Sequence, residues 1–148
     1  MKKSLAFVFL FLIIVFIILF MRFKDLKRQN LDTMSFNSDY EIFNIEQVNG
    51  LDVATAINKA ISNNEKYAVS KDENEYYDIN DNYCVEVYVS VIMNDSGDAK
   101  TVRMENFNKN GMGNFISLYA DVKFKCTNIE YNSSTGKVKS ITFKQLES

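Results

Sequence analysis

The chain has 148 residues, with 17 lysines and arginines, 19 aspartates and glutamates, and no histidine, proline or tryptophan. The absence of histidine excludes Ser-His-Asp and Cys-His nucleophile systems and histidine-containing zinc sites. About 120 residues follow the basic segment that ends near residue 28, enough for one domain with a modest core.

The charges divide the chain into two parts. Residues 1–28 carry six lysines and arginines against one aspartate, a net charge of +5, and residues 29–148 carry eleven against eighteen acids, a net of −7. Because the larger part is acidic, we expect no nucleic-acid partner.

The longest apolar stretch, residues 5–21, reads LAFVFLFLIIVFIILFM and contains no polar side chain. As a helix it would be roughly 25 Å long, close to the thickness of a hydrocarbon core once its flanking residues are added. A helix of a water-soluble protein would show a polar face. We therefore predict a transmembrane helix at residues 5–21, between a basic tip at 1–4 and a basic juxtamembrane stalk at 22–38, with the lipid bilayer as a partner.

A cleaved secretory signal is the alternative interpretation of this stretch. The apolar run exceeds a usual signal core, and it is followed by Arg22, Phe23 and Lys24 in place of a small-x-small cleavage site. We therefore favour the interpretation of residues 5–21 as an uncleaved signal-anchor.

Two signals disagree about membrane orientation. A count of basic residues favours a cytoplasmic C-terminal part, whereas the short basic tip before the apolar run favours export. We expect an extracytoplasmic domain in a single-pass protein of the cell membrane. The basic side chains predicted to contact anionic head groups are Arg22, Lys24, Lys27 and Arg28.

The remainder, residues 39–148, predicts a small α+β domain. Asn49 as N-cap and Asp52 as its capping-box partner predict a helix over residues 51–63, with Val53, Ile57, Ala60 and Ile61 on its apolar face. Strands are expected at residues 40–47, 66–71, 83–92 and 99–104, and a hairpin at 122–131 and 137–145. The expected fold is one amphipathic helix packed on a mostly antiparallel sheet.

Three connecting segments complete this reading. Residues 35–39 are expected to break the N-terminal helix, and 94–98 to form a turn. Residues 107–113 are expected to be a loop, while 115–119 are compatible with helix or strand. In strand 83–92, Tyr83 and the valines at odd positions should face the core, leaving Glu86 and its even neighbours half exposed.

Two cysteines, Cys84 and Cys126, lie on predicted strands. Outside the cell they could form a disulfide that closes a loop of about forty residues; the alternative is a pair of buried free thiols. With no histidine to activate either thiol, neither is expected to be catalytic.

The acidic segment 72–82 offers the other candidate sites. Asp78, Asn80 and Asn82 are spaced like the first half of a calcium loop, but the glycine and the twelfth-position glutamate of that motif are absent, so a solvated loop is favoured over a metal site. Core packing is the default for the aromatic residues, and Tyr76 and Tyr77 are the candidates for an exposed partner patch. No acid lies in an apolar context that would raise its pKa, so we expect no catalytic residue and no cofactor.

The order of elements, a hydrophobic N-terminal helix followed by an antiparallel-sheet head, resembles that of type IV pilins and pseudopilins. The residues 3–8, KSLAFV, contain no matching prepilin-peptidase site and no acidic residue. Residues 49–57, NGLDVATAI, and the closing hairpin are similar to small single-pass membrane proteins of low-GC Gram-positive bacteria; this similarity implies no activity.

These observations favour a non-enzymatic, membrane-anchored extracytoplasmic protein that acts by protein–protein contact or self-association, as an accessory subunit of a surface, pilus-like or secretion assembly. The alternative is a membrane-tethered module that senses a ligand or ion through the acidic segment 72–81. A hydrolase that uses carboxylates has the least support, because it would need a cleft in which acids converge.

Overall fold

A computed structural model describes residues 2–92, 99–109 and 111–147, and the side chains from residue 9 onward. The chain forms two compact units, Met1–Ser35 and Phe36–Ser148. The predicted turn at residues 94–98 lies outside the described residues.

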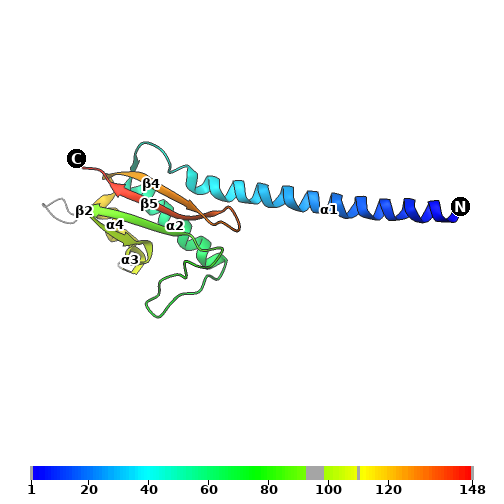
Figure 1. The fold of residues 1–148 in the computed structure, drawn as a ribbon. Coiled ribbons are helices and arrows are strands. Elements are labelled where there is room, and N and C mark those ends of the chain that lie inside the picture. The colour runs from blue at the N-terminus through cyan, green and yellow to red at the C-terminus, as the bar shows by residue number, and fades with distance from the viewer. Residues whose placement is uncertain (1, 93–98, 110, 148) are drawn as a thin grey trace. The chain divides into compact units, whose positions relative to one another are not determined.

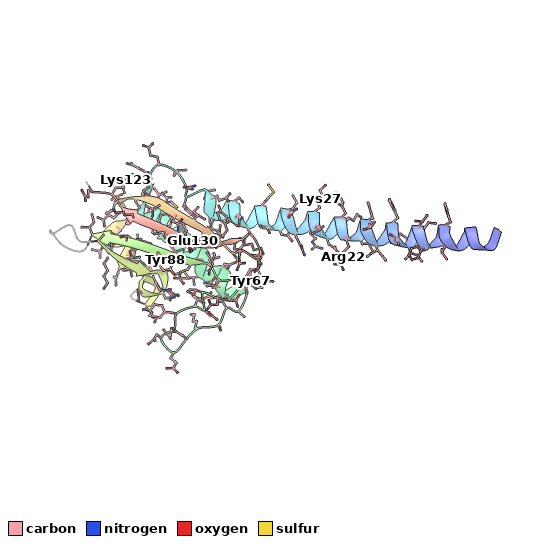
Figure 2. The ribbon with its side chains drawn as sticks, in the orientation of Figure 1. Arg22, Lys27, Tyr67, Tyr88, Lys123 and Glu130 are labelled. Carbon is pink, nitrogen blue, oxygen red and sulfur yellow. The ribbon has the colours of Figure 1, made fainter. Side chains whose placement is uncertain are left out.

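The first unit is a single stretch of helix, the larger part of α1 (Lys2–Glu41). Its large apolar side chains from Phe9 to Met21 are each between 43% and 70% exposed, and the basic residues that follow, including Arg22 and Lys27 in Figure 2, are exposed as well. Among the described residues, no helix contains a stretch that meets the length and apolarity of a membrane span. The predicted segment 5–21 begins among residues whose side chains lie outside the described part.

The second unit is α+β, as predicted, and is built on one five-stranded sheet in the order β1-β4-β5-β2-β3 (Figure 1). The strands are β1 (Val48–Asn49), β2 (Glu86–Ile92), β3 (Ala99–Arg103), β4 (Lys123–Tyr131) and β5 (Val138–Gln145). The predicted hairpin of β4 and β5 is confirmed, and so is the strand β3.

The sheet is mixed, which corrects the expectation of a mostly antiparallel arrangement of hairpins. The strand β5 lies between β4 and β2, antiparallel to the first and parallel to the second. The parallel pair requires a long connection, which the segment from β3 through β4 supplies.

The helix α2 (Gly50–Lys66) confirms the predicted amphipathic helix. The Asn49 side chain accepts a hydrogen bond from the backbone N–H of Asp52 at 3.0 Å, and the Asp52 carboxylate accepts one from the N–H of Asn49 at 2.9 Å. This reciprocal capping box fixes the start of the helix. The predicted apolar face is buried against the sheet: Val53, Ile57, Ala60 and Ile61 are at most 9% exposed.

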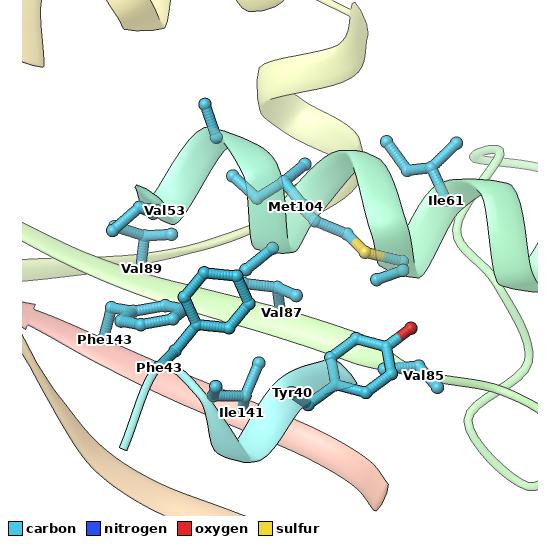
Figure 3. Close-up of a cluster of buried hydrophobic side chains, with 14 of the residues drawn as sticks. Tyr40, Phe43, Val53, Ile61, Val85, Val87, Val89, Met104, Ile141 and Phe143 are labelled. Atoms are coloured by element: carbon cyan, nitrogen blue, oxygen red, sulfur yellow. The ribbon is translucent and has the colours of Figure 1, made fainter. Parts of the chain in front are cut away.

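The core lies between the helices and the valine face of β2. Figure 3 shows Val85, Val87 and Val89 beside Ile141 and Phe143 of β5, with Val53, Tyr40 and Phe43 packed against them. The alternation of buried valines along β2 is confirmed. Tyr83 is an exception, because it precedes the strand and is 46% exposed.

The predicted strand at residues 40–47 is wrong. The helix α1 continues through the predicted break and ends at Glu41, and Tyr40 and Phe43 enter the core; the Phe43 ring meets Phe143 edge-on with centroids 6.1 Å apart. The cause is tertiary. The Asn37 side chain donates to the Gly136 carbonyl and accepts from the Val138 N–H, which ties this part of the helix to the β4–β5 hairpin.

Two further helices were not predicted, α3 (Met104–Lys109) and α4 (Met112–Tyr119), where a loop and an ambiguous segment were expected. Both are too short to show a clear helical period, and packing determines them. Phe115 of α4 is buried between Phe107 and Phe124, with ring centroids 4.8 and 6.4 Å away.

The predicted strand at residues 66–71 is also wrong. Tyr67 is the C-cap of α2, and Ala68 has a φ of 52°, which turns the chain away. Only Lys71 forms an isolated bridge, to Tyr77, in the long connection from α2 to β2.

Candidate functional site

The most unusual chemical feature of the second unit is a cluster of two buried carboxylates and one half-buried guanidinium. Glu86 is the first residue of β2, Arg103 the last of β3, and Glu105 lies in the first turn of α3. Arg103 Nη2 donates to Glu86 Oε2 at 2.6 Å and to Glu105 Oε1 at 3.0 Å. Both glutamates are at most 3% exposed.

The register of the β2–β3 pair explains why these residues meet. Tyr88 pairs with Arg103, so the long Arg103 side chain reaches diagonally to Glu86 two residues earlier. The chain turns into α3 directly after Arg103, and this places Glu105 against the same guanidinium nitrogen.

The cluster contains one more negative group than positive groups if both acids are ionised. The pKa of the Glu86 carboxyl is raised to about 8, chiefly because the group is buried; the hydrogen bond from Arg103 opposes this rise, and the nearby Glu105 carboxyl adds to it. Burial also lowers the pKa of Arg103, but the hydrogen bond and the charge of Glu86 outweigh it, so the net shift is upward. The raised pKa favours the protonated form of the Glu86 carboxyl at neutral pH.

This result corrects the expectation that no acid lies in an apolar context. Glu86 lies between Val85 and Val87, and its position on the even face of β2 predicted half exposure; it is 2% exposed. The connection between α2 and β2, which sequence patterns do not place, binds the partners of Glu86 through Tyr77.

That connection, residues 67–85, is attached directly to the cluster and is here named the Glu-latch loop. The Tyr77 N–H donates to Glu105 Oε1 at 2.9 Å, and Arg103 Nη2 donates to the Tyr77 carbonyl at 3.3 Å. Four buried side-chain atoms have no hydrogen-bond partner among the described residues: Tyr77 Oη, Glu86 Oε1, Arg103 Nε and Glu105 Oε2. Buried atoms without a hydrogen-bond partner lower the stability of the folded state. The cluster is therefore held together by few hydrogen bonds relative to the number of its polar atoms.

Side chains of the Glu-latch loop also stabilise its own turns. Asp72 Oδ1 accepts from the N–H groups of Asn74 and Tyr76, Asp78 Oδ1 accepts from that of Asn80, and Asp81 Oδ1 accepts from that of Tyr83. Each carboxylate thus forms a local turn. These three aspartates therefore stabilise the conformation of the loop.

The predicted calcium half-site gains no support from this arrangement. The Oδ1 atom of Asp78 already accepts hydrogen bonds from the backbone and the side chain of Asn80, and the Asn82 amide oxygen accepts one from Asn132. Among the described residues, no group of three or more acids or cysteines is placed to hold a metal ion.

The expectation of an exposed tyrosine patch is wrong. Tyr77 is 4% exposed, with the Lys71 ammonium 4.5 Å from its ring centroid. Tyr76 is half-buried: its ring lies 4.7 Å from both the Arg103 guanidinium and the Lys109 ammonium, and its hydroxyl donates to Asn106 at 2.8 Å. Lys109 also donates to the Asn74 carbonyl, so these tyrosines attach the loop to α3.

The cysteines are free and buried, so the disulfide alternative is wrong. Cys126 pairs with Phe143, which pairs in turn with Val89, and Cys84 lies five residues before Val89. At about 3.3 Å per residue, the two Cα atoms are separated by well over 10 Å, beyond the roughly 7 Å limit of a disulfide. Burial raises the pKa of both thiols, that of Cys84 to about 12.

No pocket described in the second unit includes Glu86 or Glu105. One pocket, of about 560 Å³, is lined by Tyr76, Asn106 and Phe107 among others. The raised pKa of Glu86 resembles that of a catalytic acid, but its carboxyl does not line this pocket.

Comparison with known proteins is uninformative: no family model, curated protein or solved structure matches the chain.

Proposed function

We propose that the protein is a non-enzymatic, membrane-anchored subunit that presents its second unit for protein–protein contact on the extracytoplasmic side. The anchor is the predicted segment 5–21, and the partner is recognised through the exposed part of the Glu-latch loop. The pilin-like order of elements agrees with a role as an accessory part of a surface or secretion assembly.

Support for the anchor comes from the apolar side chains of α1. The large ones from Phe9 to Met21 occur at nearly every position of this stretch, and each is at least 43% exposed. A helix that is apolar on every side requires an apolar environment. The lysines and arginines at positions 22, 24, 27 and 28 are exposed at its end, where anionic head groups would attract them.

The observation that carries the contact proposal is the order of the Glu-latch loop. Ordered loops of this length without regular structure are uncommon, and they usually have a function. This loop is attached at Tyr76 and Tyr77, while its acidic tip at Glu73 and Glu75 is exposed. A charged tip whose flanking residues are held by hydrogen bonds loses less conformational entropy on binding than an unattached loop would.

Support for a non-enzymatic role comes from the same cluster that resembles a catalytic pair. Glu86 and Glu105 converge on Arg103, but both side chains are at most 3% exposed, and the Tyr77 backbone binds Arg103 and Glu105. A general acid or base must come within hydrogen-bond reach of its substrate.

Photo-crosslinking tests the contact proposal. A photoreactive amino acid at Glu73, in the exposed tip, should form a discrete adduct in intact cells. The same group at Asp121, an exposed residue between α4 and β4, is the matched control and should not. An adduct of twice the mass of the chain would identify a second copy as the partner. Equal labelling at both positions, or none at Glu73, would contradict the proposal.

Thiol labelling tests the side of the membrane. Ser133 is exposed in the β4–β5 hairpin loop, so a Ser133→Cys variant lacking Cys84 and Cys126 offers one accessible thiol. The proposal predicts reaction with an impermeant maleimide before cell lysis. Reaction only after lysis would place the second unit in the cytoplasm.

A further inference from the structure

The Glu86–Arg103–Glu105 cluster joins three elements to the Glu-latch loop through few bonds. Glu86 and Glu105 share a single guanidinium nitrogen, and the loop backbone at Tyr77 binds both to that nitrogen and to Glu105. A change in the charge of the carboxyl pair therefore acts directly on the two hydrogen bonds of the Tyr77 backbone.

We propose that this cluster is a proton-operated latch, which holds the Glu-latch loop against α3 while the carboxyl pair retains one proton and releases it when that proton is lost. The proposal concerns regulation of the contact surface proposed above and rests on that function for its biological meaning, but the latch itself is a property of the isolated chain.

The charge balance explains the direction of the switch. With one proton on the pair, the remaining carboxylate and Arg103 neutralise each other. When the proton leaves, two buried carboxylates are bound to one guanidinium nitrogen. Two like charges held beside the same nitrogen in a site of low polarity repel each other strongly. The simplest relief is to admit water, which would replace the hydrogen bonds of the Tyr77 backbone to Glu105 and Arg103 and so let this segment of the loop move.

The other charged and titratable groups around Glu86 do not supply a second cation. On β2 itself they are Tyr88 and Cys84, on β4 Glu130 through its hydrogen bond to Ser140, and on the loop Tyr77 and Asp81. Lys71 lies against the Tyr77 ring and Glu65 acts on the same hydroxyl. Lys71 reaches Tyr77 but forms no ion pair with either glutamate among the described residues.

Tyr76 keeps one part-buried attachment after release, because its hydroxyl donates to Asn106 at 2.8 Å. The other attachments are weaker. Lys109 pairs with Glu75 at 3.7 Å and donates to the Asn74 carbonyl, but both acceptors are exposed, and surface contacts of this kind contribute little. Loss of the Tyr77 anchor should therefore loosen the tip, which is then held mainly through Tyr76, while the sheet and α2 stay folded.

A nitroxide at the loop tip measures the release directly. The probe is placed by Asn74→Cys in the full chain in detergent, in a Cys84→Ala/Cys126→Ala background; Asp121→Cys is the control site. The tip label should be ordered at about pH 6 and mobile at about pH 9.5, with a midpoint near the pKa of about 8 assigned to Glu86, while the control label stays unchanged.

Glu86→Gln distinguishes the latch from general alkaline unfolding. The amide keeps the shape of the protonated carboxyl but has no proton to lose in this range, so the tip should stay ordered at both pH values. Glu130→Gln, the matched control, removes a neighbouring carboxylate and should leave the transition intact. An unchanged wild-type spectrum across the range, or a transition that persists in Glu86→Gln, would overturn the proposal.

Carboxyl carbon NMR of the wild-type chain keeps the test independent of variant folding. One glutamate should titrate near pH 8; titration of every glutamate below about pH 6 would overturn the latch. Because neither measurement involves a partner, failure of the latch and failure of the crosslinking at Glu73 are separate results.

Discussion

Two asparagine side chains stabilise this fold by acting as short pieces of strand. Asn64, fully buried at the end of α2, donates to the Val85 carbonyl at 2.9 Å and accepts from the Val85 N–H at 2.8 Å. Asn37 does the same for Gly136 and Val138. Each amide binds backbone groups just before or at the start of a strand, on the side where the pairing of β2 with β5 has not yet begun.

Replacing Asn64 by alanine should lower the free energy of unfolding by about 2–4 kcal/mol, because two buried backbone groups lose their partners. Asn58→Ala, an exposed asparagine in the same helix, should change it by less than about 0.5 kcal/mol. Thermal unfolding followed by circular dichroism compares the two. Equal effects would show that the amide of Asn64 contributes nothing specific.

The stability of the second unit should depend on pH through Glu86. Its pKa is raised on folding from 4.5 to about 8, so its favourable contribution is complete below about pH 4.5 and is lost as the pH rises through 8. By proton linkage the loss is on the order of 4 kcal/mol or less.

Glu86→Gln should remove this pH dependence, since the amide cannot ionise. The variant should be as stable as wild type near pH 5 and more stable at pH 8 to 9. Melting temperatures measured across the range provide the check. A wild-type protein whose melting temperature is constant from pH 5 to pH 9 would contradict the assignment.

At the scale of elements, the close approach of α2 and α4 depends on Gly50. A Cβ atom added at Gly50 would lie 1.8 Å from the Tyr119 carbonyl oxygen, and the Gly50 N–H donates to the Ala120 carbonyl at 3.1 Å. The start of α2 is thus in direct backbone contact with the end of α4.

Gly50→Ala should therefore destabilise the second unit by about 2 kcal/mol or more, because backbone cannot move aside as a side chain can. Gly113→Ala is the matched control: nothing lies within 4 Å of its added Cβ, and alanine is the better helix former, so its effect should be neutral or slightly stabilising. Chemical denaturation of both variants gives the comparison. Similar stabilities would mean that α4 does not pack on α2 as described.

Local sequence patterns predicted the elements whose signals are local. The capping box at Asn49 and Asp52, the buried face of α2, the β4–β5 hairpin and the alternating valines of β2 all follow from residues within one element. The strand prediction for residues 40–47 was wrong because contacts with a distant part of the chain determine this segment. Asn37 binds the β4–β5 hairpin, and the residues that follow it form the end of α1 and a loop despite their strand propensity.

The candidate site was missed for a related reason. A lone glutamate between valines is typical of the exposed face of a strand, and nothing near Glu86 in sequence indicates a cover. One signal was available: pairing the predicted strands 83–92 and 99–104 as antiparallel neighbours can bring Arg103 beside Tyr88, diagonal to Glu86, as in the observed register. The hydrogen bonds of Tyr77 to Glu105 and Arg103 depend on the path of a long loop, which the hydrophobic periodicity of the sequence does not predict.

At the scale of the whole molecule, the two units have opposite surface chemistry. The first has an apolar helix with exposed side chains and a basic end, and the second has an acidic surface with a closed core. Membrane anchoring is the claim on which the rest of the proposed function depends, because it gives a contact domain a fixed place to act.

The most direct test is extraction of the full chain from membranes with alkaline carbonate. We expect the wild-type chain to stay in the membrane pellet. Ile14→Lys/Ile17→Lys should release it, since each lysine near the centre of a span costs about 3 kcal/mol. The matched control, Leu26→Lys/Leu31→Lys, changes two equally exposed apolar residues of α1 beyond the predicted span and should stay in the pellet. Release of the wild-type chain, or equal retention of both double variants, would contradict the membrane anchor.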